Sequence, residues 1–144
     1  MKLYLDNCCF NRPFDDQSQL RARLECEAKL KIQEEIRAGS FQLAWSYILD
    51  YENSKNPFQE RKEQIGGWKK YAEQDIHENA KLTGFADTLN KKGFQKLDSL
   101  HIACAIFMKC DYFLTTDDSI LKKAALLNEI HIDDPIGFIK EVAL

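Results

Sequence analysis

The sequence has no hydrophobic run approaching the length of a membrane span, no internal repeat and no low-complexity linker. It also has no excess of positive charge, because 23 Asp and Glu residues outnumber 20 Lys and Arg residues and give a formal net charge of −3. Attraction of the whole molecule to nucleic acid or to an anionic membrane is therefore not expected. A polyanionic partner would have to bind through a local basic patch or through bridging metal ions.

The five cysteines form no CxxC pair, and two of them are adjacent, which suits neither a zinc site nor an ordinary disulfide. No signal peptide precedes the first predicted strand. We therefore expect reduced thiols in a cytoplasmic protein, with the cysteines serving mainly as small buried hydrophobic residues. They are Cys8, Cys9, Cys26, Cys104 and Cys110.

Short apolar runs alternate with helical spacing along the 144 residues, which is enough chain for a single domain, 1–144, with a substantial core. Strands are predicted at 3–5, 41–45, 112–114 and 130–132. Helices are predicted at about 18–38, 47–54, 78–92, 97–107, 119–127 and after Pro135, with one or two short helices within 59–70 and a loop at 7–16. This rhythm predicts an α/β fold around a mainly parallel sheet.

Six acidic residues stand where predicted strands end or near the start of predicted helices: Asp6, Asp50, Glu52, Asp98, Asp117 and Asp118. Asp98 fits the N-terminus of the most apolar helix, where a carboxylate can cap free amides. If the strand order reverses beside the first strand, Asp6 and Asp117 meet at the carboxyl edge of the sheet, where open α/β sheets bind ligands.

Clustered carboxylates cannot all stay ionised without cations. Oxygen ligands of this kind suit Mg²⁺ or Mn²⁺, and an ion held there can activate water and stabilise charge on a phosphoryl oxygen. The pattern thus points to hydrolysis of a phosphodiester. Acidic residues are also common at strand ends and helix caps for purely structural reasons. The pattern alone therefore leaves both the catalytic and the structural interpretation open.

Four segments, at 3–7, 46–52, 97–103 and 113–117, resemble the signature blocks of PIN-domain proteins in order and separation. The resemblance covers nearly the whole chain. It implies a three-layer α/β/α sandwich and a metal-dependent endonuclease of single-stranded RNA, similar to the VapC toxins of toxin–antitoxin pairs. It also implies a homodimer and a small antitoxin partner.

Carried over by position, the resemblance assigns the acidic quartet of the family to Asp6, Glu52, Asp98 and Asp117. Among these, Asp6, Asp98 and Asp117 are expected to bind the Mg²⁺ or Mn²⁺ ion. Thr116 matches a hydroxyl position beside the last acid.

Some positions around the quartet depart from the family pattern. Many toxins carry a hydroxyl directly after the first acid, and here Asn7 could take part of its place. Asp50 is the alternative to Glu52 as the second acid, although the spacing from Ser46 favours Glu52. Asp118 is an extra carboxylate that could be a peripheral ligand or the cap of the next helix.

Basic residues follow the first and second predicted strands, and Arg12 is the best candidate for an RNA contact because its loop leaves from Asp6. The other candidates for a groove along the RNA backbone are Lys55, Arg61, Lys62, Lys69 and Lys70, with Trp68 or Tyr71 available for base stacking. A solubilising helix face explains the same basic residues equally well. His101 could orient a carboxylate or a water, or be a hydrogen-bonded core histidine.

Other classes fit less well. A receiver domain would need a second acid after the first strand, where Asn7 stands, and a phosphatase with an Asp-x-Asp motif would need Asp where Cys8 stands. The remaining alternatives are a catalytically inactive PIN-like module that binds or assembles, and a solitary RNA-processing nuclease without an antitoxin.

Overall fold

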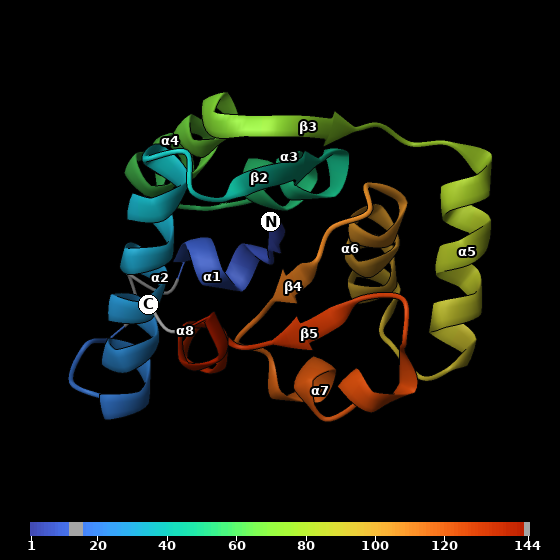
Figure 1. The fold of residues 1–144 in the computed structure, drawn as a ribbon. Helices are drawn as coiled ribbons and strands as arrows, with labels where there is room; N and C mark the ends of the chain where they lie inside the picture. Colours follow the sequence, from blue (N-terminus) through green and yellow to red (C-terminus); the bar gives the residue numbers. More distant parts are fainter. Residues whose placement is uncertain (12–15, 143–144) are drawn as a thin grey trace.

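The computed structural model describes residues 1–11 and 16–142, and its centre is a sheet of parallel strands. The strands are β1 (Lys2–Leu5), β2 (Gln42–Ser46), β3 (Ala72–Ile76), β4 (Tyr112–Leu114) and β5 (His131–Asp133), in the spatial order β3-β2-β1-β4-β5. Every pairing is parallel (Figure 1). This confirms the predicted parallel sheet.

The helices cover both faces of the sheet. They are α1 (Asn7–Asn11), α2 (Leu20–Arg37), α3 (Tyr47–Ser54), α4 (Gln59–Gly67), α5 (Ala80–Lys91), α6 (Lys96–Phe107), α7 (Asp118–Leu121) and α8 (Pro135–Val142), with 3₁₀ turns at Trp68–Tyr71 and Ala124–Leu126. Right-handed crossovers place α2 on one face, and the return from β3 to β4 places α5 and α6 on the other. Helix α8 packs on α2, and α5 packs on α6 at the far side of the molecule (Figure 1). The three-layer α/β/α prediction is therefore confirmed.

Strand β1 lies at the centre because it is apolar on both faces. Leu3, Tyr4 and Leu5 are almost fully buried, as a central strand of a parallel sheet must be. The chain leaves β1 toward β2 on one side and returns to β4 on the other, so the strand order reverses beside β1. The carboxyl ends of β1 and β4 thus meet at the predicted switch point.

The core beneath this edge is aromatic. The ring of Tyr4 stacks on Phe113 of β4 at 5.3 Å between centroids, and Phe10 of α1 packs on Trp45 of β2 at 5.4 Å. These rings are almost completely buried. The core therefore fixes the ends of β1, β2 and β4 relative to one another.

Two elements differ from the predicted boundaries near the sheet. Residues 7–16 were predicted as a loop, but the chain enters helix α1 directly after Asp6, and Cys9 N donates to Asp6 O at 2.9 Å. Strand β3 was not predicted, because its sequence Ala-Glu-Gln-Asp-Ile has no apolar run. It is an edge strand with three exposed residues, and backbone pairing to β2 defines it instead of hydrophobic pattern.

Two helix predictions are also corrected. The predicted helix at 119–127 is divided into α7 and the 3₁₀ turn Ala124–Leu126. Asp98 does not cap α6, since the N-cap residue is Gln95 and Asp98 lies in the first turn.

Arg12, the predicted RNA contact, lies outside the described residues. None of the helices in residues 1–11 and 16–142 combines the length and the hydrophobicity that a membrane span requires.

Candidate metal and catalytic site

Asp6 is the centre of the candidate site, and the ends of β1 and β4 hold it in place. Its backbone N–H donates to Leu114 O at 2.9 Å, which extends the β1–β4 pairing by one residue. Its carboxylate accepts hydrogen bonds from Asn7 N and from Thr115 Oγ1, each at 2.8 Å, and from the Cys8 thiol at 3.4 Å. With only 6% of the residue exposed, Asp6 is a buried carboxylate in a fixed orientation.

Glu52 reaches the same place from α3. Its Oε1 hydrogen-bonds with His101 Nε2, and its Oε2 accepts from Asn7 Nδ2 at 3.2 Å. His101 Nε2 also lies 3.8 Å from Asp6 Oδ1. Ligand atoms of Asp6, Glu52 and His101 therefore converge within 4.8 Å of one another.

A buried chain of hydrogen bonds holds the other ring nitrogen of His101, Nδ1, in place. The Tyr4 hydroxyl hydrogen-bonds with His101 Nδ1 and with Ser46 Oγ, both at 2.6 Å, and Ser46 Oγ accepts from Leu49 N at the start of α3. Because α3 carries Glu52, this chain ties the helix and the histidine to one central strand. His101 is thus a fully partnered core residue that also orients a carboxylate, which combines the two interpretations left open by the sequence.

The pKa of His101 is raised by its carboxylate neighbours. Burial of the imidazole lowers its pKa, but the hydrogen bond with Glu52 and the charges of Asp6, Glu52 and Asp98 together outweigh burial. The protonated ring is favoured for the same reason that a cation would be: negative charge is concentrated in a low-dielectric site.

Asp98 in α6 and Asp117 at the end of β4 are not among the groups that converge within 4.8 Å, but the charge of Asp98 interacts with those of Asp6, Asp117 and Glu52. Asp98 is half-buried and forms no hydrogen bond or ion pair with the described part of the chain. Burial, followed by the charges of Asp6 and Asp117, raises its pKa from 3.8 to about 6. Asp117 Oδ1 accepts from the backbone N and the hydroxyl of Ser119, both at 2.8 Å, and so caps α7.

The raised pKa of Asp98 predicts a gain in stability when its charge is removed. The unfolded chain loses this proton at a lower pH than the folded protein, so the penalty is absent below about pH 3.8 and complete above about pH 6. Taken in full the shift is worth about 3 kcal/mol, and solvent screening of a half-buried group reduces it to about 1 kcal/mol. We expect Asp98→Asn to raise the thermal midpoint of the metal-free protein at pH 7 by about 2–4 °C.

Thermal unfolding of both proteins with a chelator present, at pH 4 and pH 7, measures this effect. The difference between wild type and variant should shrink at pH 4, where Asp98 is protonated. An equal difference at both pH values would contradict the role assigned to the charge. Asp87→Asn, at an exposed position of α5, is the matched control.

Two of the predicted supporting acids lie outside the cluster. Asp50 accepts from Trp45 Nε1 at 2.9 Å and pairs with Lys69 Nζ at 3.0 Å. Asp118 accepts from both terminal guanidinium nitrogens of Arg21, at 2.9 and 2.8 Å. Of the two candidates for the second acid, the structure brings Glu52 to Asp6 and turns Asp50 toward Trp45 and Lys69.

The hydroxyl that contacts Asp6 belongs to Thr115, whereas the sequence predicts a supporting hydroxyl at Thr116. The buried Oγ1 of Thr116 has no hydrogen-bond partner among the described residues. Cys8 was also missed, although its sulfur accepts from Thr116 N at 3.3 Å and its thiol contacts Asp6. The signal was the strand pairing: Leu5 is opposite Leu114, so the next residues, Asp6 and Thr115, meet.

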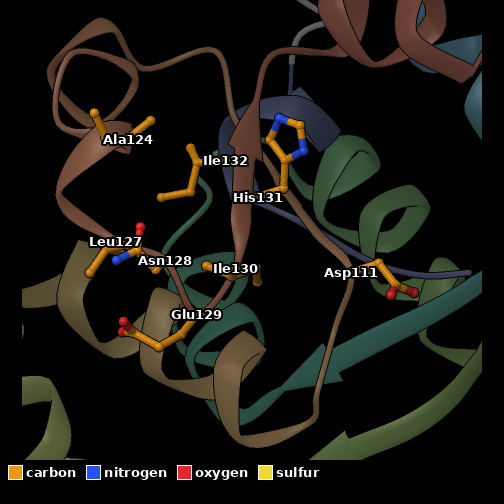
Figure 2. A pocket seen from close by; sticks show the side chains of 9 residues that line it. Asp111, Ala124, Leu127, Asn128, Glu129, Ile130, His131 and Ile132 are labelled. Carbon is orange, nitrogen blue, oxygen red and sulfur yellow. The ribbon is translucent and has the colours of Figure 1, made fainter.

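A pocket of about 600 Å³ beside β5 does not belong to this site. Figure 2 shows its lining, which includes Asp111 before β4 and Asn128, Glu129 and Ile130 before β5. These residues lie at the amino ends of the strands, opposite the edge that carries Asp6. The acidic cluster therefore occupies the edge at which parallel sheets usually bind ligands, and the pocket of Figure 2 does not.

The donor set fits a divalent cation. Asp6 and Glu52 offer hard oxygen ligands within the converging cluster, whereas Asp98 and Asp117 lie outside it, and none of the four forms an ion pair with a lysine or arginine of the described residues. Within the part of the chain that the structure describes, the ion-pair contacts of this quartet are those of Asp6 and Glu52 with His101. A bound Mg²⁺ or Mn²⁺ would neutralise the excess negative charge of this site. The same charge contributes to the raised pKa of Asp98.

No family model and no curated protein matches the sequence. Solved structures do match the fold. The crystal structure of VapBC2 from Rickettsia felis, bound to a DNA fragment from its promoter, matches with a TM-score of 0.58 and 16% identity, covering 93% of this chain and 98% of that chain. The crystal structure of FitAcB from Neisseria gonorrhoeae matches with a TM-score of 0.54 and 15% identity, covering 92% and 97%. At such identities the likeness concerns the fold alone, and the chain has the PIN-like, VapC-like fold that its four sequence blocks predicted.

Proposed function

We propose that this protein is a Mg²⁺- or Mn²⁺-dependent endoribonuclease that cleaves single-stranded RNA, with Asp6, Glu52, Asp98 and Asp117 as its catalytic carboxylates. The observation that carries the proposal is that ligand atoms of Asp6, Glu52 and His101 lie within 4.8 Å of one another. The negative charges of Asp98 and Asp117 add to the charge of this site. A buried Asp6 and three half-buried acids that have no lysine or arginine partner among residues 1–11 and 16–142 cost folding free energy, which a metal-binding role explains.

The carboxylates divide the work between binding and orientation. Asp6, Asp98 and Asp117 would hold the ion, with Asp6 locked by Thr115 and Asn7 and with Oδ2 of Asp117 left over from helix capping. When bound, the ion supplies an activated water and stabilises charge on a phosphoryl oxygen. Glu52 is held between His101 and Asn7, so that its charge stays beside Asp6.

The comparisons support a toxin–antitoxin setting. Both matched structures carry the names of two-component complexes, and one of them is bound to promoter DNA. By analogy, we propose a small antitoxin protein as a partner of this chain. A homodimer and a cytoplasmic location remain predictions from the sequence, and light scattering tests the first of them.

The proposed function is tested by metal binding and RNA cleavage with the same preparation. We expect Mn²⁺ to bind by calorimetry, to stabilise the fold against heat, and to stimulate cleavage of at least one RNA in a panel of single-stranded oligomers. A chelator should abolish cleavage and excess Mn²⁺ should restore it. A protein that neither binds Mn²⁺ nor cleaves RNA would be the inactive PIN-like module instead.

The setting is tested separately from the chemistry. An adjacent reading frame that encodes a small protein with a DNA-binding segment and a tail is expected for a toxin. Cleavage without such a neighbour would favour the solitary RNA-processing nuclease.

A further inference from the structure

Next to the acidic cluster lies a pocket of about 270 Å³ formed where α1, α3 and α4 meet. Asn7 and Glu52 line it and also belong to the site around Asp6, so the two are continuous. The remaining lining comes mainly from α1 and from the connection between α3 and α4. A substrate held at Asp6 therefore has this pocket as its immediate neighbour.

The wall of this pocket is an exposed aromatic ring stacked with a guanidinium group. Phe58, the N-cap residue of α4, is 53% exposed, and the guanidinium carbon of Arg61 lies 4.2 Å from its ring centroid. Phe58 N donates to Asn56 Oδ1 at 3.1 Å, which fixes the turn that presents the ring. Flat π surfaces and guanidinium planes are the groups on which unpaired nucleobases stack.

Positive charge and side-chain amides complete the pocket. Lys55 lies one helical turn after Glu52, on the same side of α3, and forms no ion pair with the described residues. The side chains of Asn11 and Asn56 also line the pocket, where Asn56 Nδ2 donates to Asn11 Oδ1 at 3.4 Å. Asn7 Oδ1 is buried without a hydrogen-bond partner among the described residues. In a chain of net charge −3, cations placed beside an acidic cluster suit a phosphodiester that must approach it.

We propose that this pocket is a nucleotide subsite, in which one unpaired base of the RNA stacks on the Phe58–Arg61 wall while Lys55 contacts the adjoining phosphate. The inference rests on the proposed nuclease function and adds the residues that hold the substrate. At about 270 Å³ the pocket is slightly below the range of about 300–1,000 Å³ typical of drug-sized ligands, which suits a single base. Only a base outside a duplex can stack in this way, so the subsite requires single-stranded RNA.

The structure separates this group from the other basic and aromatic candidates. Lys69 pairs with Asp50 and Asp75, and the Trp68 ring contacts Arg37 and Tyr71. Neither Trp68 nor Tyr71 lines the pocket beside Asp6. The stacking residue is therefore Phe58, in place of Trp68 or Tyr71, which the sequence suggests.

Fluorescence anisotropy with a labelled single-stranded RNA, in the presence of a chelator, tests the subsite without cleavage. We expect Phe58→Ala to weaken binding about tenfold, Phe58→Trp to restore it, and Tyr71→Ala, an exposed aromatic outside the pocket, to leave it unchanged. Lys55→Met should reduce the dependence of binding on salt by about one phosphate contact. Thermal midpoints of all variants show whether each is folded.

An abasic oligomer makes the test specific for stacking. Removing the one base that occupies the subsite should weaken binding to wild type and leave binding to Phe58→Ala unchanged. If every abasic position affects both proteins equally, or if wild type does not bind RNA, the subsite is overturned.

The two proposals fail in different ways. Suppose that wild type cleaves RNA with metal and that Phe58→Ala cleaves at the same rate and binds RNA with the same affinity. This result would refute the subsite and leave the nuclease function standing. Phe58-dependent binding in a protein that never cleaves would keep the subsite and remove the nuclease function.

Discussion

Replacing Asp6 by asparagine is expected to lower the rate of metal-stimulated RNA cleavage at least about a thousandfold, equivalent to about 4 kcal/mol of lost transition-state stabilisation, while the protein stays folded. Asp6 is the buried carboxylate toward which Asn7, Thr115, His101 and the charge of Asp98 converge. An amide of the same shape keeps an acceptor for Asn7 N but removes the negative charge that would bind the cation.

The fold should tolerate this substitution for a specific reason. Removing the Asp6 charge relieves its repulsion with Asp98, which offsets the weaker hydrogen bond with Thr115. Cleavage rates, Mn²⁺ calorimetry and thermal midpoints of wild type and variant provide the measurement. Asp50→Asn is the matched control, because Asp50 pairs with Lys69 and accepts a hydrogen bond from Trp45 outside the cluster. This variant should cleave RNA like wild type. Comparable activity of Asp6→Asn and wild type would exclude the proposed site.

Replacing Phe113 by alanine is expected to lower the free energy of unfolding by about 3–5 kcal/mol. The ring is fully buried in β4 and stacks on Tyr4, so its removal leaves a cavity in the centre of the sheet that neighbouring strands cannot close. Because the Tyr4 hydroxyl holds His101, the same cavity also loosens the support of Glu52.

Chemical denaturation measures this loss, and the variant should have a much lower midpoint with an unchanged slope. Phe107→Ala provides the control. Phe107, at the end of α6, is 36% exposed, and its ring centroid lies 5.8 Å from that of Phe85. Its removal should therefore lower the free energy of unfolding by about 1 kcal/mol or less. Equal losses for the two variants would show that the β1–β4 core does not carry the stability assigned to it.

Local pattern was sufficient for elements whose own residues define them. The apolar run Leu3–Leu5 predicted a buried central strand, and Ser46 predicted the start of α3, where its hydroxyl accepts from Leu49 N. Pattern failed where the neighbours define the element. Strand β3 is polar and exists through its pairing with β2, and Asp98 resembles a helix cap but lies inside the first turn of α6.

The positions of the acids relative to strands and helices follow from the amino-acid pattern, because each stands after a strand end or a helix start that hydrophobic periodicity reveals. Which of these groups meet depends on the three-dimensional fold. The pairing of Leu5 with Leu114 brings Thr115 to Asp6, and the helix α3 turns Glu52 toward His101 and Asp50 toward Lys69. These contacts join residues 19 to 109 positions apart. They depend on strand register and on the packing of helices across the sheet, which no local sequence window contains.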